Sequence, residues 1–245
     1  MINLEPLNQT KLFGLDKFIL EFIKLEKNGK LPNKILLSGQ KGIGKSTLAY
    51  HLINYSLSKE EEYKYDTSKF EINPNNQSFR TTINKSNPNV ILIDLNLDKK
   101  TIDIGQIREL ILNLNKSSLN NKPRFVLMDN IEYLNFNSVN AILKVLEEPS
   151  SKVHFILINN NKKIFSTLFS RCINFRISLS NKMKLSISDQ LINGKLASVI
   201  NKDLINYYFT PGNIYHLFKF AENNDYDLSN LDLKDFIKLV IKNNH

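Results

Sequence analysis

The sequence is poor in the residues that build disulfide and metal-centred frameworks. Cys172 is the single cysteine among 245 residues, which excludes an intramolecular disulfide and a thiolate zinc cluster. The four histidines are scattered without the spacing of metal ligands. A single cysteine fits a reducing compartment, so we expect a cytoplasmic protein without a zinc site.

Long apolar runs and a secretory leader are also missing. No stretch approaches the roughly 18 apolar residues that a membrane-spanning helix needs. The first residues, MINLEPLNQTKLFG, lack the basic-then-apolar layout of a signal peptide. We therefore expect no membrane partner. The hydrophobic share of 42% can still bury the core of one large domain, or of one domain and a smaller one.

Acidic residues are in the minority. Lysine and arginine outnumber aspartate and glutamate by 33 to 24, which gives a formal net charge of +9. Such an excess suits a polyanionic partner such as nucleic acid. No run of five basic residues marks a patch, so scattered lysines that only maintain solubility explain the charge equally well. Charge alone leaves direct contact with DNA open.

Glycine is scarce too, yet three of the eight glycines lie within six residues. The stretch ILLSGQKGIGKSTLAYHLI has the spacing G-x-x-x-x-G-K-S of a phosphate-binding loop. A short apolar strand at 35–37 precedes the loop and a helix at 45–57 follows it. Glycines allow successive N–H groups to turn toward a phosphate, and the helix N-terminus adds further donors. A glycine-rich turn without a ligand is the structural alternative.

We predict that this loop binds ATP and Mg²⁺. Lys45 would reach the β- and γ-phosphates, and Ser46 or Thr47 would coordinate the metal. Asp129, which follows four apolar residues, would meet the same metal, because the carboxyl ends of parallel strands line the ligand crevice. The nucleotide contacts predicted from the loop and this strand end are Gly39, Gly42, Gly44, Lys45, Ser46, Thr47 and Asp129.

Strands and helices alternate through the first 175 residues. Strands are expected at 35–37, 90–94, 125–129 and 153–158, and helices at 12–26, 45–57, 103–114 and 138–148. Residues 59–88 are polar and contain two prolines, so we expect an irregular or partly ordered connection. Short apolar strands separated by helices indicate a parallel sheet that is covered on both faces.

The strand pattern ends near residue 177. Helices are expected at 182–193, 201–208, 213–222 and 231–243. We therefore predict an α/β nucleotide-binding domain over residues 1–177 and a small helical domain over residues 178–245.

Two strings outside the loop, NAILKVLEEP at 140–149 and SRC at 170–172, resemble a known family. They are similar to the clamp-loader branch of AAA+ ATPases, and within it to the delta-prime subunits of bacterial DNA polymerase III. The similarity runs from LFG at 12–14 to the SRC string, and a further similar segment is FTPGNIYHL at 209–217. It implies a RecA-like P-loop NTPase (AAA+) domain, followed by a helical lid.

The resemblance also implies a function and its partners. The family's members form a hetero-oligomeric ATP-driven ring that opens a sliding clamp and places it on primed DNA during replication. Arg171 of the SRC string would be an arginine finger that acts on a neighbouring subunit's ATP. Alternatively, Arg171 has only a structural role and pairs with a local carboxylate. Asn159 or Asn160 corresponds to the sensor of the γ-phosphate.

Several positions depart from the family pattern. Asn130 stands where AAA+ ATPases usually carry a glutamate that orients or deprotonates the attacking water, and an amide cannot take a proton. Glu132 lies three positions after Asp129 and need not point to the same place. Asn213 replaces a lid residue that is often basic, and residues 59–88 lack a four-cysteine zinc module. Slow hydrolysis by this subunit is therefore expected.

The family's usual third domain, a helical collar, has little room before His245, so a shortened member or a fragment is expected. Three other functions stay open. The chain could be the motor subunit that turns over ATP itself, a stand-alone P-loop phosphotransferase, or a scaffold that keeps the loop only as structure. ATP turnover with and without partners separates them.

Overall fold

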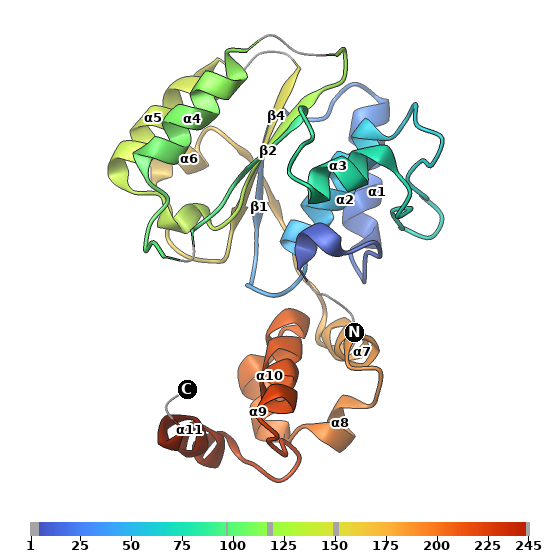
Figure 1. Ribbon diagram of the computed structural model, residues 1–245, viewed down its shortest axis with the longest axis vertical. Helices are drawn as coiled ribbons and strands as arrows, with labels where there is room; N and C mark the ends of the chain where they lie inside the picture. Colours follow the sequence, from blue (N-terminus) through green and yellow to red (C-terminus); the bar gives the residue numbers. More distant parts are fainter. Residues whose placement is uncertain (1–4, 97, 117–119, 149–151, 244–245) are drawn as a thin grey trace. The chain divides into compact units, whose positions relative to one another are not determined.

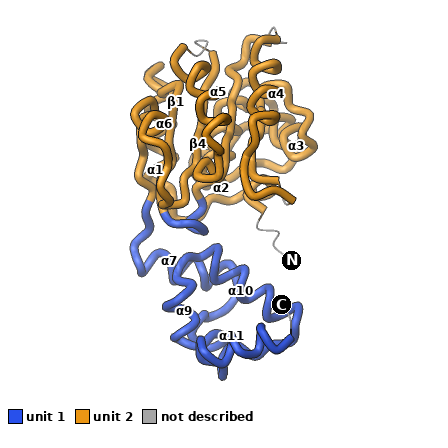
Figure 2. The backbone as a smooth tube through the Cα atoms, turned by 90° about the vertical axis from the view of Figure 1, so that its left-hand side faces the viewer, with its two compact units in different colours: residues 1–4, 40–44, 178–245 blue, residues 5–39, 45–177 orange. Residues whose placement is uncertain are grey.

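The computed structural model describes residues 5–96, 98–116, 120–148 and 152–243. The chain forms two compact units, which Figure 2 distinguishes by colour. The larger unit contains Glu5–Gly39 and Lys45–Ile177, and the smaller one joins Gln40–Gly44 to the segment from Ser178 onward. The middle of the glycine-rich loop therefore belongs with the C-terminal helices, and its two ends belong with the larger unit.

A five-stranded parallel sheet forms the centre of the larger unit, with the strand order β2-β3-β4-β1-β5. The strands are β1 (Lys34–Ser38), β2 (Val90–Ile93), β3 (Arg124–Met128), β4 (Val153–Asn159) and β5 (Ile173–Arg176). The predicted parallel sheet is confirmed. The fifth strand was missed because its sequence, INFR, is mostly exposed at the sheet edge and lacks a buried apolar run.

Helices cover both faces of this sheet (Figure 1). One face carries α1 (Asp16–Lys27), α2 (Lys45–Leu57) and α3 (Gln77–Ile83), and the other carries α4 (Ile104–Leu114), α5 (Phe136–Glu147) and α6 (Ser166–Phe169). Two single-turn 3₁₀ helices, η1 (Pro6–Asn8) and η2 (Ile131–Tyr133), complete the unit. Because both faces are covered, the middle of each central strand is a continuous apolar run, such as FVLM in β3 and FILI in β4.

Local side-chain caps explain where several helices begin. The Asp103 side chain accepts a hydrogen bond from the Gln106 N–H, and the Gln106 side chain accepts one from the Asp103 N–H, so α4 starts as predicted. Helix α5 starts two residues earlier than predicted, because the Asn135 side chain caps it. Helix α1 starts later than predicted, since the Leu12 N–H donates to the Phe70 carbonyl instead.

The connection over residues 59–88 is partly ordered. It contains α3, whose first turn is capped by the Asn76 side chain. Asn76 is itself fully buried and accepts a hydrogen bond from Asn54 of α2 at 2.9 Å. A short antiparallel bridge joins Asp66 to Glu71. The connection is therefore partly ordered, and asparagine side chains supply that order in place of the missing apolar periodicity.

The smaller unit contains the helices α7 (Asn181–Leu191), α8 (Leu196–Val199), α9 (Lys202–Tyr208), α10 (Pro211–Asn223) and α11 (Leu233–Lys242). Its core is formed by side chains such as Leu204, Ile214 and Phe236. The four predicted helices are present, whereas α8 is too short to show periodicity. The domain boundary and the role of a lid stay predictions. Within the described residues, every helix is too short or too polar to span a bilayer.

Candidate nucleotide site at the carboxyl edge of the sheet

The carboxyl ends of the parallel strands bring most of the predicted site residues to one edge of the larger unit. Lys45 begins the helix that follows the β1 loop, Asp129 and Asn130 follow β3, and Asn160 follows β4. These side chains form a continuous set of hydrogen bonds. The sheet topology therefore assembles residues that lie more than 100 positions apart in the sequence.

Lys45 is held at this edge as a buried cation. Its side chain is buried, with 3% of the residue exposed. The ammonium donates to the carbonyl oxygen of Gly39 and to Oδ1 of Asn160, each at 2.9 Å. Both of these acceptors are neutral groups, and together they fix the position of the ammonium. An anionic phosphate would interact with it strongly in this partly dehydrated setting.

Ser46 and Asp129 form the second half of the arrangement. The Ser46 hydroxyl donates to Oδ2 of Asp129, and the Asn130 N–H donates to Oδ1 at 2.7 Å. Burial raises the pKa of Asp129 above its usual value, although the Ser46 hydrogen bond opposes that shift. Hydroxyl and carboxylate oxygens are ligands that Mg²⁺ prefers, so these residues fit the metal. Ser46, not Thr47, is the hydroxyl that reaches Asp129.

The two candidate asparagines after β4 have different surroundings. Asn159 is buried as the last residue of the strand, and its carbonyl accepts a hydrogen bond from the Gly39 N–H at 3.3 Å. Its side chain donates to the Lys162 carbonyl at 2.9 Å. Asn160 is the residue that contacts Lys45. Asn159 thus supports the start of the loop, and the sensor role of Asn160 stays a prediction.

Asn160 also connects to the residues after β3. Its Nδ2 donates to Oδ1 of Asn130 and to Oε1 of Glu132, each at 3.0 Å. Asn130 has the left-handed backbone conformation, with φ of 56°, and the η2 turn that follows brings Glu132 back toward Asn160. Spacing along the sequence gave no sign of this, because it depends on one left-handed residue.

One residue at this edge was missed by sequence reasoning. Asp94 directly follows β2, and its Oδ1 accepts a hydrogen bond from Nδ2 of Asn130 at 2.7 Å. A signal was present, since VILI before Asp94 has the same pattern as FVLM before Asp129. An apolar strand that ends in aspartate occurs twice in this sheet, on neighbouring strands.

The middle of the glycine-rich loop lies in the smaller unit. Gly42 and Gly44 have φ of 82° and 93°, which side chains rarely allow. A Cβ at Gly42 would lie 2.6 Å from Oγ1 of Thr210, and the Gly42 carbonyl accepts a hydrogen bond from the Gly212 N–H at 2.8 Å. Asn213 also lies against Gly42, so an amide occupies the place where the family often has a basic residue.

Arg171 lies just after α6, and its hydrogen-bond partners differ from those of the residues at the sheet edge. Its guanidinium donates to Oε1 of Glu147 at 2.7 Å and to the Thr167 carbonyl at 2.9 Å. The local carboxylate pair is therefore present. The side chains are 32% and 54% exposed, and such pairs contribute at most about 1 kcal/mol. The finger role stays a prediction that this weak pair does not oppose.

The remaining candidate groups have ordinary structural environments. Cys172 is half-buried against the core, and burial raises the pKa of its thiol to about 11, so it is an unreactive thiol at neutral pH. In the described part of the chain, no three histidine, cysteine, aspartate or glutamate residues gather in a metal-binding arrangement.

Comparison with known proteins identifies the family. The family model described as "DNA polymerase III, delta subunit" matches residues 14–181. The chain is 30% identical over 154 residues to DNA polymerase III subunit gamma of Buchnera aphidicola subsp. Schizaphis graminum, covering 62% of this chain and 39% of that protein. It is 29% identical over 165 residues to the delta' subunit of the same organism, covering 65% and 47%. The chain thus spans less than half the length of these relatives.

Solved structures share the fold. A DNA polymerase III gamma subunit-related protein of Thermotoga maritima superimposes with a TM-score of 0.51 at 18% identity, covering 82% of this chain and 56% of that one. The RuvB Holliday junction branch migration motor of the same organism gives 0.50 at 16%, covering 92% and 70%. These likenesses support an AAA+ fold. Because the family match extends over more than half of the sequence, the protein belongs to the DNA polymerase III delta subunit family of clamp-loader AAA+ proteins.

Proposed function

We propose that this protein is a delta-prime-like subunit of a DNA polymerase III clamp loader. In this proposal it joins other subunits in a ring that uses ATP to open a sliding clamp and place it on primed DNA. Family membership supports the role, and the gamma and delta' relatives support the type of complex. The observation that carries the nucleotide part is the joining of Lys45, Asn160, Ser46 and Asp129 at one sheet edge.

The chain's own residues would bind ATP with Mg²⁺. The backbone of Gly39, Gly42 and Gly44 would surround the phosphates, and Lys45 would contact the β- and γ-phosphates. Ser46 and Asp129 would hold the metal, which when bound supplies positive charge against the phosphates. Asn160 would contact the γ-phosphate, because it already lies against Lys45.

Hydrolysis by this subunit alone would be slow. Asn130 offers an amide where a carboxylate usually follows the metal-binding aspartate, and the lid carries Asn213 in place of a cation. Arg171 would act on a neighbouring subunit's nucleotide. Exposed apolar side chains next to it, Phe169 and Ile173, fit an interface with another subunit.

The motor subunit of the same complex is the second candidate. The observation that favours it is the match at 30% identity to a gamma subunit, together with a complete phosphate-binding loop. In that case, the chain would turn over ATP itself.

ATP turnover separates these functions. The chain would be assayed alone, and then with clamp-loader partner subunits, sliding clamp and primed DNA. We expect ATP binding but very slow turnover by the chain alone, together with copurification of the partners. Fast turnover by the chain alone would favour the motor subunit or a stand-alone phosphotransferase. A chain that neither binds ATP nor associates with the partners would contradict the proposed function.

A further inference from the structure

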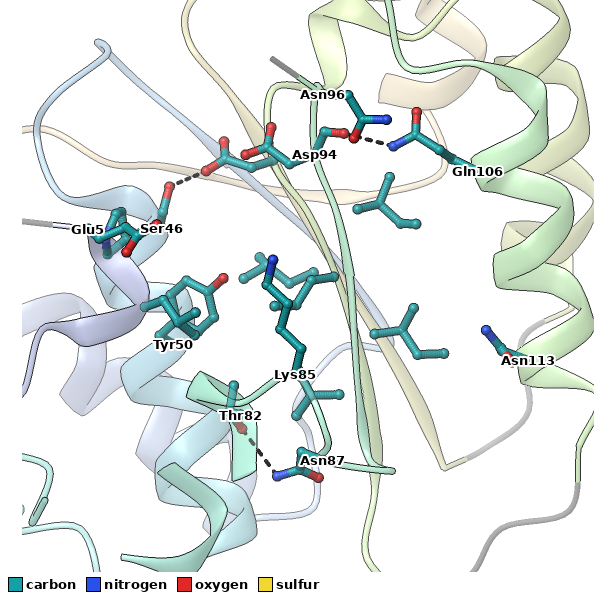
Figure 3. A pocket seen from close by; sticks show the side chains of 18 residues that line it. Glu5, Ser46, Tyr50, Thr82, Lys85, Asn87, Asp94, Asn96, Gln106 and Asn113 are labelled. Carbon is teal, nitrogen blue, oxygen red and sulfur yellow. Dashed lines mark hydrogen bonds between the residues drawn. The ribbon is translucent and has the colours of Figure 1, made fainter. Parts of the chain in front are cut away.

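A pocket of about 500 Å³ opens in the larger unit beside the edge strand β2. Figure 3 shows Asp94 at the same end of this pocket as Ser46, whose hydroxyl bonds to Asp129. Asp94 is exposed to solvent there. Water therefore has access to a carboxylate that lies next to the residues proposed to hold the metal.

The two oxygens of Asp94 have different surroundings. Oδ1 accepts hydrogen bonds from Nδ2 of Asn130 at 2.7 Å and from the Leu95 N–H at 2.6 Å. Within the described residues, Oδ2 accepts no hydrogen bond from the protein. The carboxylate is thus fixed in orientation through one oxygen, while the other remains available to a water molecule.

The neighbouring carboxylates are already engaged. Asp129 uses one oxygen for Ser46 and the other for the Asn130 N–H. Glu132 uses Oε1 for the Asn160 side chain and Oε2 for the Asn160 N–H, at 3.0 and 3.3 Å. Asp94 is the carboxylate of this group that combines an anchored position with a free oxygen.

We propose that Asp94 is the carboxylate that orients the attacking water and accepts its proton, the role that Asn130 cannot fill. The inference rests on the proposed function, because it requires ATP at the Lys45 edge. The water oxygen forms a bond to the γ-phosphorus as the bond from that phosphorus to the ADP oxygen breaks, and the electron pair leaves with ADP. One water proton passes to Asp94. Asn130 positions Asp94 through its amide and can hydrogen-bond the same water.

In this arrangement the carboxylate comes from the end of β2 and not from the position directly after Asp129. That position, Asn130, supplies an amide that hydrogen-bonds the carboxylate on the neighbouring strand. Hydrolysis is therefore measurable, and it remains slow because Asn213 replaces a cation.

The test compares Asp94→Asn with wild type and with Asp98→Asn. Asp94→Asn changes one atom and removes the carboxylate, and Asp98→Asn removes the same charge from an exposed position on the following loop. Single-turnover hydrolysis of γ-labelled ATP is measured with the chain in excess. The dissociation constant for ATP is measured separately, at several Mg²⁺ concentrations. Positioned proton acceptors contribute about 10²–10⁴-fold, so we expect Asp94→Asn to lose at least about 100-fold in rate. ATP affinity should stay within about twofold, and Asp98→Asn should match wild type in both.

Three results would overturn the inference. The first is an Asp94→Asn rate within about threefold of wild type with ATP still bound. The second is a wild type that binds ATP without any hydrolysis. The third is a loss of Mg²⁺-dependent affinity in Asp94→Asn as large as that in Asp129→Asn, which would make Asp94 a metal ligand. Failure of the proposed function looks different, because then Lys45→Ala would bind ATP as well as wild type.

Discussion

Lys45 and Arg171 are two cations with proposed roles at phosphates, and the fold holds them in opposite ways. Lys45 is buried, and its ammonium donates to the Gly39 carbonyl and the Asn160 side chain. Arg171 is partly exposed and pairs with Glu147, a carboxylate that is exposed itself. One cation is part of the interior, and the other lies on the surface with a partner that water can replace.

The difference matches what the two proposed roles require. A group that serves the chain's own ligand gains from burial, because burial fixes its position and strengthens its interaction with an anion. A group that serves a neighbour must remain accessible, and a weak exposed pair leaves it so. Substitutions on either side of this comparison should therefore affect different measurements.

The largest effect is expected from Arg171→Ala. An arginine finger contributes about 10³–10⁵ in rate, because the guanidinium neutralises charge on the transferred phosphoryl group. We expect ATP turnover by the reconstituted ring to fall by such a factor. The variant chain should stay folded and bind its own ATP as wild type does. Steady-state ATPase assays of the intact ring provide the measurement.

Arg171→Lys is the matched control for this prediction. It retains the positive charge but lacks the planar fork that contacts two oxygens, so only part of the rate should return. A ring that stays intact with Arg171→Ala and keeps the wild-type rate would make Arg171 a structural residue.

His51 is a second buried titratable group, and its burial makes the stability of the fold depend on pH. It is fully buried on α2, with ring nitrogens 3.0 Å from the Tyr65 hydroxyl and 3.2 Å from the Gln9 carbonyl. Burial lowers its pKa from 6.5 to about 4, which the Gln9 hydrogen bond only partly opposes. The unfolded chain therefore binds a proton between these values and the folded chain does not, so stability is complete above pH 6.5 and falls as pH drops toward 4. The loss amounts to about 3 kcal/mol.

Urea unfolding between pH 7.5 and 4 measures this dependence. His51→Gln should flatten the slope of the free energy of unfolding over that range, whereas His216→Gln, at an exposed position, should leave it unchanged. Equal slopes in wild type and His51→Gln would show that another group is responsible.

The smallest effect is expected from Glu147→Gln, which weakens the exposed pair. The free energy of unfolding should change by less than about 1 kcal/mol, because exposed ion pairs contribute little. Chemical denaturation measures the change. A loss of several kcal/mol would mean that Arg171 is held as firmly as a buried group, and the contrast with Lys45 would disappear.

The strands with continuous apolar runs and the long helices could be predicted from the sequence. Burial on both faces favours the continuous apolar runs FVLM in β3 and FILI in β4, and the capping box at Asp103 marks a helix start within four residues. Strand β5 and helix α3 could not be predicted in this way. The residues of β5 are mostly exposed, and α3 is fixed by a hydrogen bond between buried asparagines. Neither leaves a hydrophobic period.

The residues of the candidate site that a local sequence motif marks could be predicted, whereas the contacts between residues on different strands could not. The loop spacing indicated Lys45 and Ser46, and the apolar strand indicated Asp129. The contacts of Asn160 with Glu132, and of Asn130 with Asp94, depend on strand order and on one left-handed residue. Without the topology, the choice between Asn159 and Asn160 could not be made from spacing.

The central claim, that Lys45 belongs to a nucleotide site of this chain, is tested most directly by ATP affinity. Equilibrium binding of ATP with Mg²⁺ would be measured for wild type, Lys45→Ala and Lys162→Ala. Lys162 is a lysine at the same sheet edge whose ammonium contacts Tyr133 instead. Two charge-assisted hydrogen bonds of about 1.5–2 kcal/mol each predict that Lys45→Ala binds roughly 300-fold more weakly. Lys162→Ala should bind like wild type, and equal affinity for wild type and Lys45→Ala would contradict the account.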